Sequence, residues 1–190
     1  LCMVVQNVKS NYDTDIFLKL ITTIEKISGL KYKKNSQIDI AFRVIADHVR
    51  AVSFSIADGQ LPSNNGAGYV IRRILRRAIR YGYSFLDLNK PFIFLLVDEL
   101  SNQMGEFYPE LHNQKDLIKK IIKDEEKAFL KTLKKGLVLL DSLINSSKKN
   151  TISGEKVFKL YDTYGFPIDL TKLIVKENNM TIDLEVFDKF

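Results

Sequence analysis

The segment GYVIRRILRRAIRYGYSFL, residues 68–86, decides the fold that we expect for this chain. Its apolar residues recur at i, i+3, i+4, i+7 and i+8, the stripe of an amphipathic helix that packs on a core. A guanidinium offers a planar fork that matches two phosphate oxygens at once. The segment therefore predicts a phosphate-binding helix or, equally, a solvated cationic face. Its arginines, five of the chain's seven, are Arg72, Arg73, Arg76, Arg77 and Arg80.

Positive charge is concentrated around this segment. Residues 66–90 carry a net charge of +5, and the whole chain of 190 residues carries +6. Clustered cations favour a polyanionic partner because binding releases condensed counterions. A membrane surface is also anionic, but the apolar face would then have to enter lipid, and that face is typical of a protein core. The charge pattern favours nucleic acid and argues against a membrane partner.

The remaining composition excludes several kinds of site. Cys2 is the only cysteine, which rules out an internal disulfide and is typical of the cytoplasm. His48 and His112 are the only histidines and cannot form a zinc cluster with one cysteine. His48, beside Asp47, fits a core or helix-surface histidine better than a catalytic base. No G-x-x-x-x-G-K motif occurs, so the residues favour recognition over catalysis.

Helical periodicity runs through almost every ordered stretch. We therefore predict the all-α class, an irregular multi-helix array with one long helix in the C-terminal half. Thr14 or Asp13 can cap a first helix over residues 15–28, and Gly29 can end it.

Two further helix starts have recognisable signals. Ser36 with Asp39 resembles a capping box, and the helix that follows would close at residues 58–59. Pro91 suits the first turn of another helix, which would extend over residues 92–104.

The C-terminal half contains the long helix. From about Asp116 apolar residues keep helical spacing for many turns with mixed charges outside, which indicates a structural strut or an antiparallel partner. Gly165 and Pro167 predict a turn between two later helices. We expect two domains: residues 1–110, a helical subdomain with the arginine segment, and residues 111–190, the long helix and a C-terminal helical subdomain that carries LYDTYGFP.

Three stretches are similar to one known family. Residues 42–82, which contain LPSNNGAGYVIRRILRRAIRYG, resemble the middle, tRNA-binding region of alanyl-tRNA synthetases. LYDTYGFPIDLT, residues 160–171, resembles a second signature of that family, and residues 1–17 resemble the stretch after its last class II catalytic motif. The family often has Arg at the position of Ala67, so a phosphate contact there is in doubt.

The resemblance implies a function. Alanyl-tRNA synthetases attach alanine to tRNA(Ala) using ATP and choose the tRNA by a G·U wobble pair in its acceptor stem. The matching positions give that role to Asn64 and Asp162. In a wobble pair the guanine amino group lacks its usual partner in the wide minor groove, where a carboxylate can accept from it. The side-chain amide of Asn64 can both donate and accept hydrogen bonds.

The resemblance also implies what lies outside the chain. ATP, magnesium and alanine would bind to a catalytic core before Leu1, and a zinc-containing editing domain would follow Phe190. We expect the chain to be a piece of a longer ligase that works in the cytoplasm. This piece alone would bind no cofactor and would be inactive.

Two other functions stay open from the residues alone. A DNA-binding helical module could place the arginine segment in a major groove, although the family implies no DNA partner, and a helical interaction domain could pair its long helix with another protein. Some arginines could instead bind carboxylates within the chain, such as Asp58 or Glu99.

Overall fold

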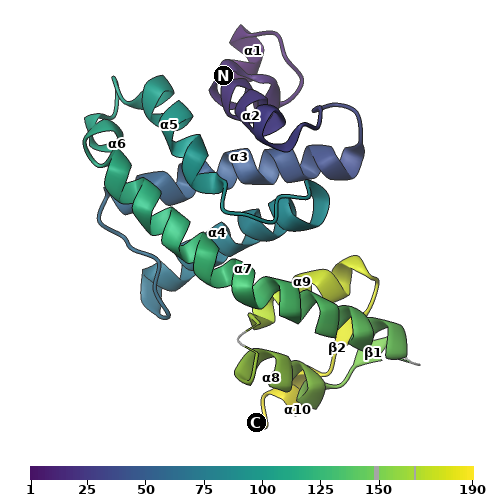
Figure 1. Cartoon of the computed structure of the whole chain (residues 1–190). Coiled ribbons are helices and arrows are strands. Elements are labelled where there is room, and N and C mark those ends of the chain that lie inside the picture. Colours follow the sequence, from purple (N-terminus) through teal and green to yellow (C-terminus); the bar gives the residue numbers. More distant parts are fainter. Residues whose placement is uncertain (148–149, 165) are drawn as a thin grey trace. The chain divides into compact units, whose positions relative to one another are not determined.

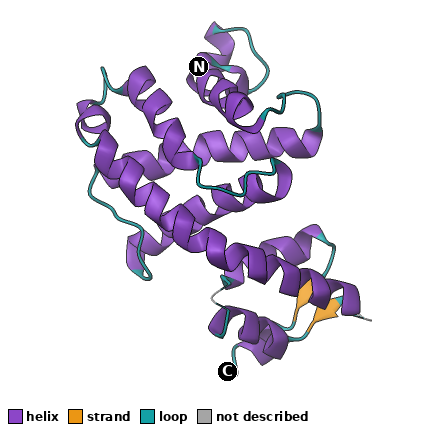
Figure 2. Cartoon of the chain, in the orientation of Figure 1, coloured by secondary structure: helices purple, strands orange, loops and turns teal. Residues whose placement is uncertain are grey.

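The computed structural model describes residues 1–147, 150–164 and 166–190. Nearly all regular structure in these residues is helical (Figure 2). The all-α prediction is confirmed, and the long helix α7 extends over Lys115–Ser146. The chain forms two compact units, Leu1–Lys127 and Ala128–Phe190. The functional division that we expect at residue 110 stays a prediction.

The N-terminal unit is built around α3. Buried side chains of α3 such as Phe42, Ile45 and Val49 form the centre of its core. Helix α3 packs along α4, which fixes the arginine segment by its apolar stripe. The elements, shown in Figure 1, are α1 (Cys2–Val5), the 3-10 helix η1 (Asn11–Asp13), α2 (Asp15–Ser28), α3 (Ser36–Ala57), α4 (Gly66–Phe85), α5 (Ile93–Met104), α6 (Pro109–Asn113) and the first part of α7.

Two helix ends lie where the sequence predicts them. Helix α2 ends at Gly29, whose φ of 74° is the left-handed conformation that glycine adopts without a steric penalty. Helix α3 ends at Asp58, and Gly59 follows with φ of 82°. At the start of α2, Thr14 is the N-cap residue, but its hydroxyl donates to the carbonyl of Asn11 rather than accepting from the helix.

The predicted start of α3 is wrong by one residue. The N-cap is Asn35, whose Oδ1 accepts from the backbone N–H groups of Gln37 and Ile38 at 2.9 and 3.2 Å. Ser36 is therefore the first helical residue. Asp39 Oδ1 accepts from the N–H of Lys33 at 2.7 Å, so its carboxylate stabilises the preceding turn. Asparagine is at least as good an N-cap as serine, and here it comes first.

The predicted start of α5 is also displaced. Pro91 lies before the helix, Phe92 is the N-cap residue, and the helix begins at Ile93. The first N–H groups of α5 are bound by the side chain of Glu126 from α7. A distant residue thus supplies the cap that the local sequence lacks.

The C-terminal unit packs smaller helices on the second part of α7. The fully buried Phe166 lies against Gly136 of α7, where a β-carbon would overlap its ring. Strands β1 and β2 pair in parallel, Thr151 with Thr181. The predicted turn at Gly165 lies outside the described residues. The elements are β1 (Thr151–Ile152), α8 (Gly154–Asp162), α9 (Ile168–Glu177), β2 (Thr181–Ile182) and α10 (Leu184–Phe187).

Candidate nucleic-acid interface

The arginines of α4 differ in exposure. They lie on a helix whose apolar stripe is buried against the core, so their positions around the axis decide how much of each side chain reaches solvent. The arginines therefore fall into three classes of exposure. Arg73 and Arg77 are exposed, Arg72 and Arg76 are partly buried, and Arg80 is buried.

Arg80 is not part of a solvated cationic face. Its side chain is only 5% exposed, because all residues over 78–82 are buried and α4 is enclosed on every face at this turn. The guanidinium carbon lies 5.2 Å from the centroid of the Tyr81 ring and 5.3 Å from that of Phe85. Arg80 is therefore part of the packing of this unit.

Arg73 and Arg77 form the exposed cationic surface of α4. Each guanidinium lies near a tyrosine ring of the same helix: Arg73 is 5.7 Å from the Tyr69 centroid and Arg77 is 5.8 Å from that of Tyr81. Ala67 is exposed in the first turn of the same helix. Position 67 therefore adds no cation to this surface.

The loop over residues 61–65 lies directly on the first turn of α4. The N–H of Ser63 donates to the carbonyl of Gly68 at 3.0 Å, and the Ser63 hydroxyl donates to the carbonyl of Asn65 at 2.7 Å. A β-carbon at Gly68 would overlap the carbonyl of Leu61. Glycine at this position thus permits the close approach that holds the loop in place.

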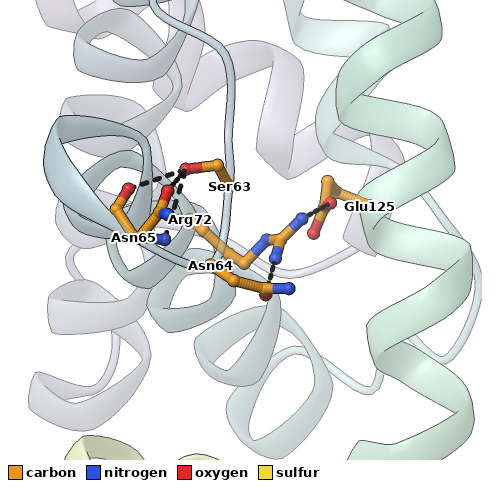
Figure 3. Close-up of polar contacts among 5 residues, drawn as sticks. All are labelled: Ser63, Asn64, Asn65, Arg72 and Glu125. Carbon is orange, nitrogen blue, oxygen red and sulfur yellow. Dashed lines mark hydrogen bonds and ion pairs between the residues drawn. The ribbon is translucent and has the colours of Figure 1, made fainter.

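Asn64 in this loop is bound by Arg72 (Figure 3). The Nη1 group of Arg72 donates to Asn64 Oδ1, and Nη2 donates to Glu125 Oε1 at 2.7 Å. The Arg72 and Glu125 side chains are 17% and 18% exposed. The loop, α4 and α7 are thus joined by one guanidinium, and its carboxylate partner is Glu125 rather than Asp58 or Glu99.

The next residue of α7, Glu126, is fully buried. Its carboxyl oxygens accept from the backbone N–H groups of Phe92, Ile93 and Phe94 at 3.0, 3.0 and 3.2 Å. Burial raises the pKa of Glu126 to about 7, against the lowering effect of these three hydrogen bonds. The side chain therefore caps α5 while its burial disfavours the charged form.

The sequence contains a signal for Glu126 that the periodicity analysis missed. The buried stripe of α7 includes Ile118, Ile122, Phe129 and Leu133, and Glu126 occupies the position of that stripe between Ile122 and Phe129. A carboxylate at an apolar position needs partners inside the protein. Glu125 lies outside this buried stripe, so the sequence gives no comparable signal for it.

Asp162 lies in the other compact unit. It is the last residue of α8 and is exposed, and its neighbours Tyr161 and Tyr164 are 48% and 37% exposed. A carboxylate at a helix C-terminus is unfavourable because the helix dipole is negative there. An acid at this position is not explained by helix stability. The structure brings together Asn64 and Arg72, whereas Asp162 lies at the end of α8 in the other unit.

Other candidate chemistry is limited. His48 Nδ1 lies 3.0 Å from Asp47 Oδ2, and burial lowers the pKa of His48 although Asp47 acts against this. Among the described residues there is no group of three or more His, Cys, Asp or Glu side chains that could hold a metal ion. Within the same residues, no helix has the length and apolar character needed to cross a bilayer.

Comparisons with known proteins cover the whole chain. Residues 1–190 match the family described as tRNA synthetases class II (A). The chain is 62% identical over 188 residues to an alanine–tRNA ligase of Christiangramia forsetii, and 56% and 52% identical over 191 residues to those of Bacteroides fragilis strain YCH46 and Cytophaga hutchinsonii. Each alignment covers 99% of this chain and 22% of the relative. The chain thus spans about a fifth of the length of these proteins.

Proposed function

This chain belongs to the class II (A) family of tRNA synthetases, and from this premise we propose that it is the tRNA-recognition part of an alanine–tRNA ligase. The observation that carries the proposal is the identity of 52–62% over nearly the whole chain to proteins named alanine–tRNA ligase. In this proposal the chain follows the class II catalytic motifs, binds the acceptor stem of tRNA(Ala) and reads its G·U wobble pair.

The cationic surface of α4 would bind the phosphate backbone. Arg73 and Arg77 are exposed on the helix that carries most of the chain's net charge. Phosphate contacts fix the position of a duplex without reading its sequence. We assign this role first to Arg73 and Arg77 and then to the partly buried Arg76. The burial of Arg80 argues for a role in packing.

Asn64 and Asp162 would read the wobble pair. Both side chains are exposed: Asn64 lies in the loop before α4, and Asp162 is the last residue of α8. A carboxylate accepts hydrogen bonds only, so Asp162 suits the unpaired amino group of guanine in the minor groove. An exposed acid at a helix C-terminus, where it costs stability, is the kind of local conflict expected at a functional position.

Activation of alanine would belong to other parts of the ligase. We propose that ATP and magnesium bind to other parts of the ligase, and that a zinc-containing editing domain also lies outside this chain. We propose that this chain alone catalyses no alanine-dependent ATP–pyrophosphate exchange and that the ligase works in the cytoplasm. Detection of ATP–pyrophosphate exchange in a pure sample of the chain would contradict the proposal that alanine is activated elsewhere in the ligase.

The test of base reading is the charging of two acceptor-stem helices that differ only in G·U or G·C. In the full-length ligase, Asn64→Ala and Asp162→Ala should each lower the G·U to G·C charging ratio roughly ten- to a hundredfold, which corresponds to about 1–3 kcal/mol per base contact. Pyrophosphate exchange should stay at the wild-type rate. A ratio unchanged in both variants would overturn the proposal.

Phosphate binding requires a separate control. Arg77→Ala should weaken binding of both helices equally and reduce the slope of log affinity against log salt by about one unit. Duplex DNA of the same length, at matched salt, serves as the competitor that tests the DNA-binding alternative.

A further inference from the structure

Arg72 of α4 has two polar partners within the N-terminal unit. Its guanidinium binds the amide oxygen of Asn64 on one side and the carboxylate of Glu125 on the other, as Figure 3 shows. The two partners lie eight and 53 residues away in the sequence. An arginine whose fork is already used within the protein, and whose charge is balanced by a carboxylate, is poorly suited to bind phosphate.

The chemistry of the guanidinium determines which atom of Asn64 faces it. Arginine carries only donors, so the amide atom that it contacts must be the oxygen. The amide nitrogen of Asn64 then points away from Arg72 with its donors available. Without Arg72 the amide could turn over, because its two ends have nearly the same shape and differ only in hydrogen bonding.

We infer that Arg72, held by Glu125, is a positioning residue for base recognition: it fixes the Asn64 amide so that Nδ2 is presented as a donor. This inference rests on the proposed function, in which Asn64 reads the wobble pair. The acceptors in the minor groove that suit such a donor are ring nitrogens, the uracil carbonyl and ribose hydroxyls.

Glu125 provides the test, because an acid cannot bind phosphate. Glu125→Gln removes the charge that holds Arg72, and Arg72→Lys keeps the positive charge but loses the fork that joins two partners. In the full-length ligase both should lower the G·U to G·C charging ratio on the order of tenfold. Asp124→Asn is the matched control, since it removes the same charge from an exposed neighbour of Glu125 on α7 and should keep the wild-type ratio.

The alternative, that Arg72 is a phosphate ligand, gives opposite results. Glu125→Gln would then release Arg72 and tighten the binding of both helices alike, and Arg72→Lys would keep the ratio. Either result overturns the inference. Pyrophosphate exchange at the wild-type rate shows that each variant is folded, and a role of Arg72 in stability alone would not change the ratio of two substrates.

Asn64→Ala, measured in parallel, separates failure of the inference from failure of the proposed function. If Asn64→Ala lowers the ratio and neither Arg72→Lys nor Glu125→Gln does, the positioning role is wrong and base reading stands. If Asn64→Ala leaves the ratio unchanged, base reading fails and the positioning role fails with it. Addition of Glu125→Gln to Asn64→Ala should lower the ratio no further, because both act on one contact.

Discussion

The two parts of α7 hold their neighbours by different interactions. In the N-terminal unit, carboxylates of α7 make directional contacts: Glu125 binds Arg72, and Glu126 binds backbone N–H groups at the start of α5. In the C-terminal unit, α7 offers a glycine, Gly136, and the ring of Phe166 packs on it. Hydrogen bonds fix orientation as well as position, whereas apolar contact depends mainly on shape. We therefore expect pH and charge to affect the stability of the N-terminal unit, and side-chain volume to affect the stability of the C-terminal unit.

The largest effect should follow removal of the Glu126 side chain. Glu126→Ala leaves three N–H groups at the start of α5, two buried and one part-buried, without their acceptor. Each unsatisfied buried group costs about 1–3 kcal/mol. We expect the free energy of unfolding at pH 5, measured with urea, to fall by at least about 3 kcal/mol. The substitution Asp124→Ala on the exposed side of α7 should change it little. A loss no larger than that of the Asp124 control would show that Glu126 does not hold α5.

Glu126 should make its own contribution to the pH dependence of stability. Its pKa is raised from 4.5 to about 7 in the folded chain, so the folded state binds the proton more tightly than the unfolded state. The resulting stabilisation is fully present below about pH 4.5 and is lost as the pH rises through about 7. It amounts to about 3 kcal/mol.

The measurement compares Glu126→Gln with the wild type. The difference in unfolding free energy between them should change by that amount from pH 4.5 to pH 7.5, because glutamine does not titrate. Parallel curves for the two proteins would contradict the raised pKa of Glu126.

The packing contact in the C-terminal unit predicts a smaller loss that is independent of pH. Gly136→Ala adds a methyl group where the Phe166 ring lies, and an overpacked core loses about 1–3 kcal/mol, partly offset by the better helix propensity of alanine. Urea unfolding at pH 5 and pH 7 should give the same loss. Phe166→Leu, combined with Gly136→Ala, should restore part of the stability by making room. If the loss of unfolding free energy caused by Gly136→Ala changed with pH, the two parts of α7 would not differ as we propose.

Glu125 should have the smallest effect on stability. Its ion pair with Arg72 is partly exposed, and such pairs contribute about 0.5–1 kcal/mol. Glu125→Gln should therefore lower the unfolding free energy by no more than about 1 kcal/mol while it impairs discrimination between acceptor stems. A loss as large as that of Glu126→Ala would identify Glu125 as a structural residue. The two adjacent acids thus separate stability from recognition.

Local sequence signals predict much of the fold. Apolar periodicity is strong enough over α2, α3, α4 and α7 to place these helices, and Gly29 and Gly59 mark ends that need a left-handed conformation. Asn35 and Ser36 are both good N-cap residues, and Asn35, which comes first, takes that role in α3. The pairing of β1 with β2 could not be predicted, because strands of two residues have no alternation to detect.

The candidate site depends on long-range contacts that local signals do not contain. Resemblance to a family leads to Asn64 and Asp162, and charge leads to the arginines of α4. Neither signal distinguishes Arg72 from Arg73. The two residues are identical and adjacent in the sequence, and they differ only in their tertiary contacts. Glu125 lies 53 residues from Arg72, so only the tertiary structure shows the pair.

The central claim is that the Asn64 amide is held in place to read a wobble pair. The direct test is the NMR signal of the side-chain NH₂ group of Asn64 in the ¹⁵N-labelled chain, followed during titration with the G·U and the G·C acceptor-stem helix. We expect this signal to shift strongly with the G·U helix and weakly with the G·C helix, while backbone signals of Arg73 and Arg77 shift with both. Equal shifts of the Asn64 signal with the two helices, or no shift with either, would contradict the account.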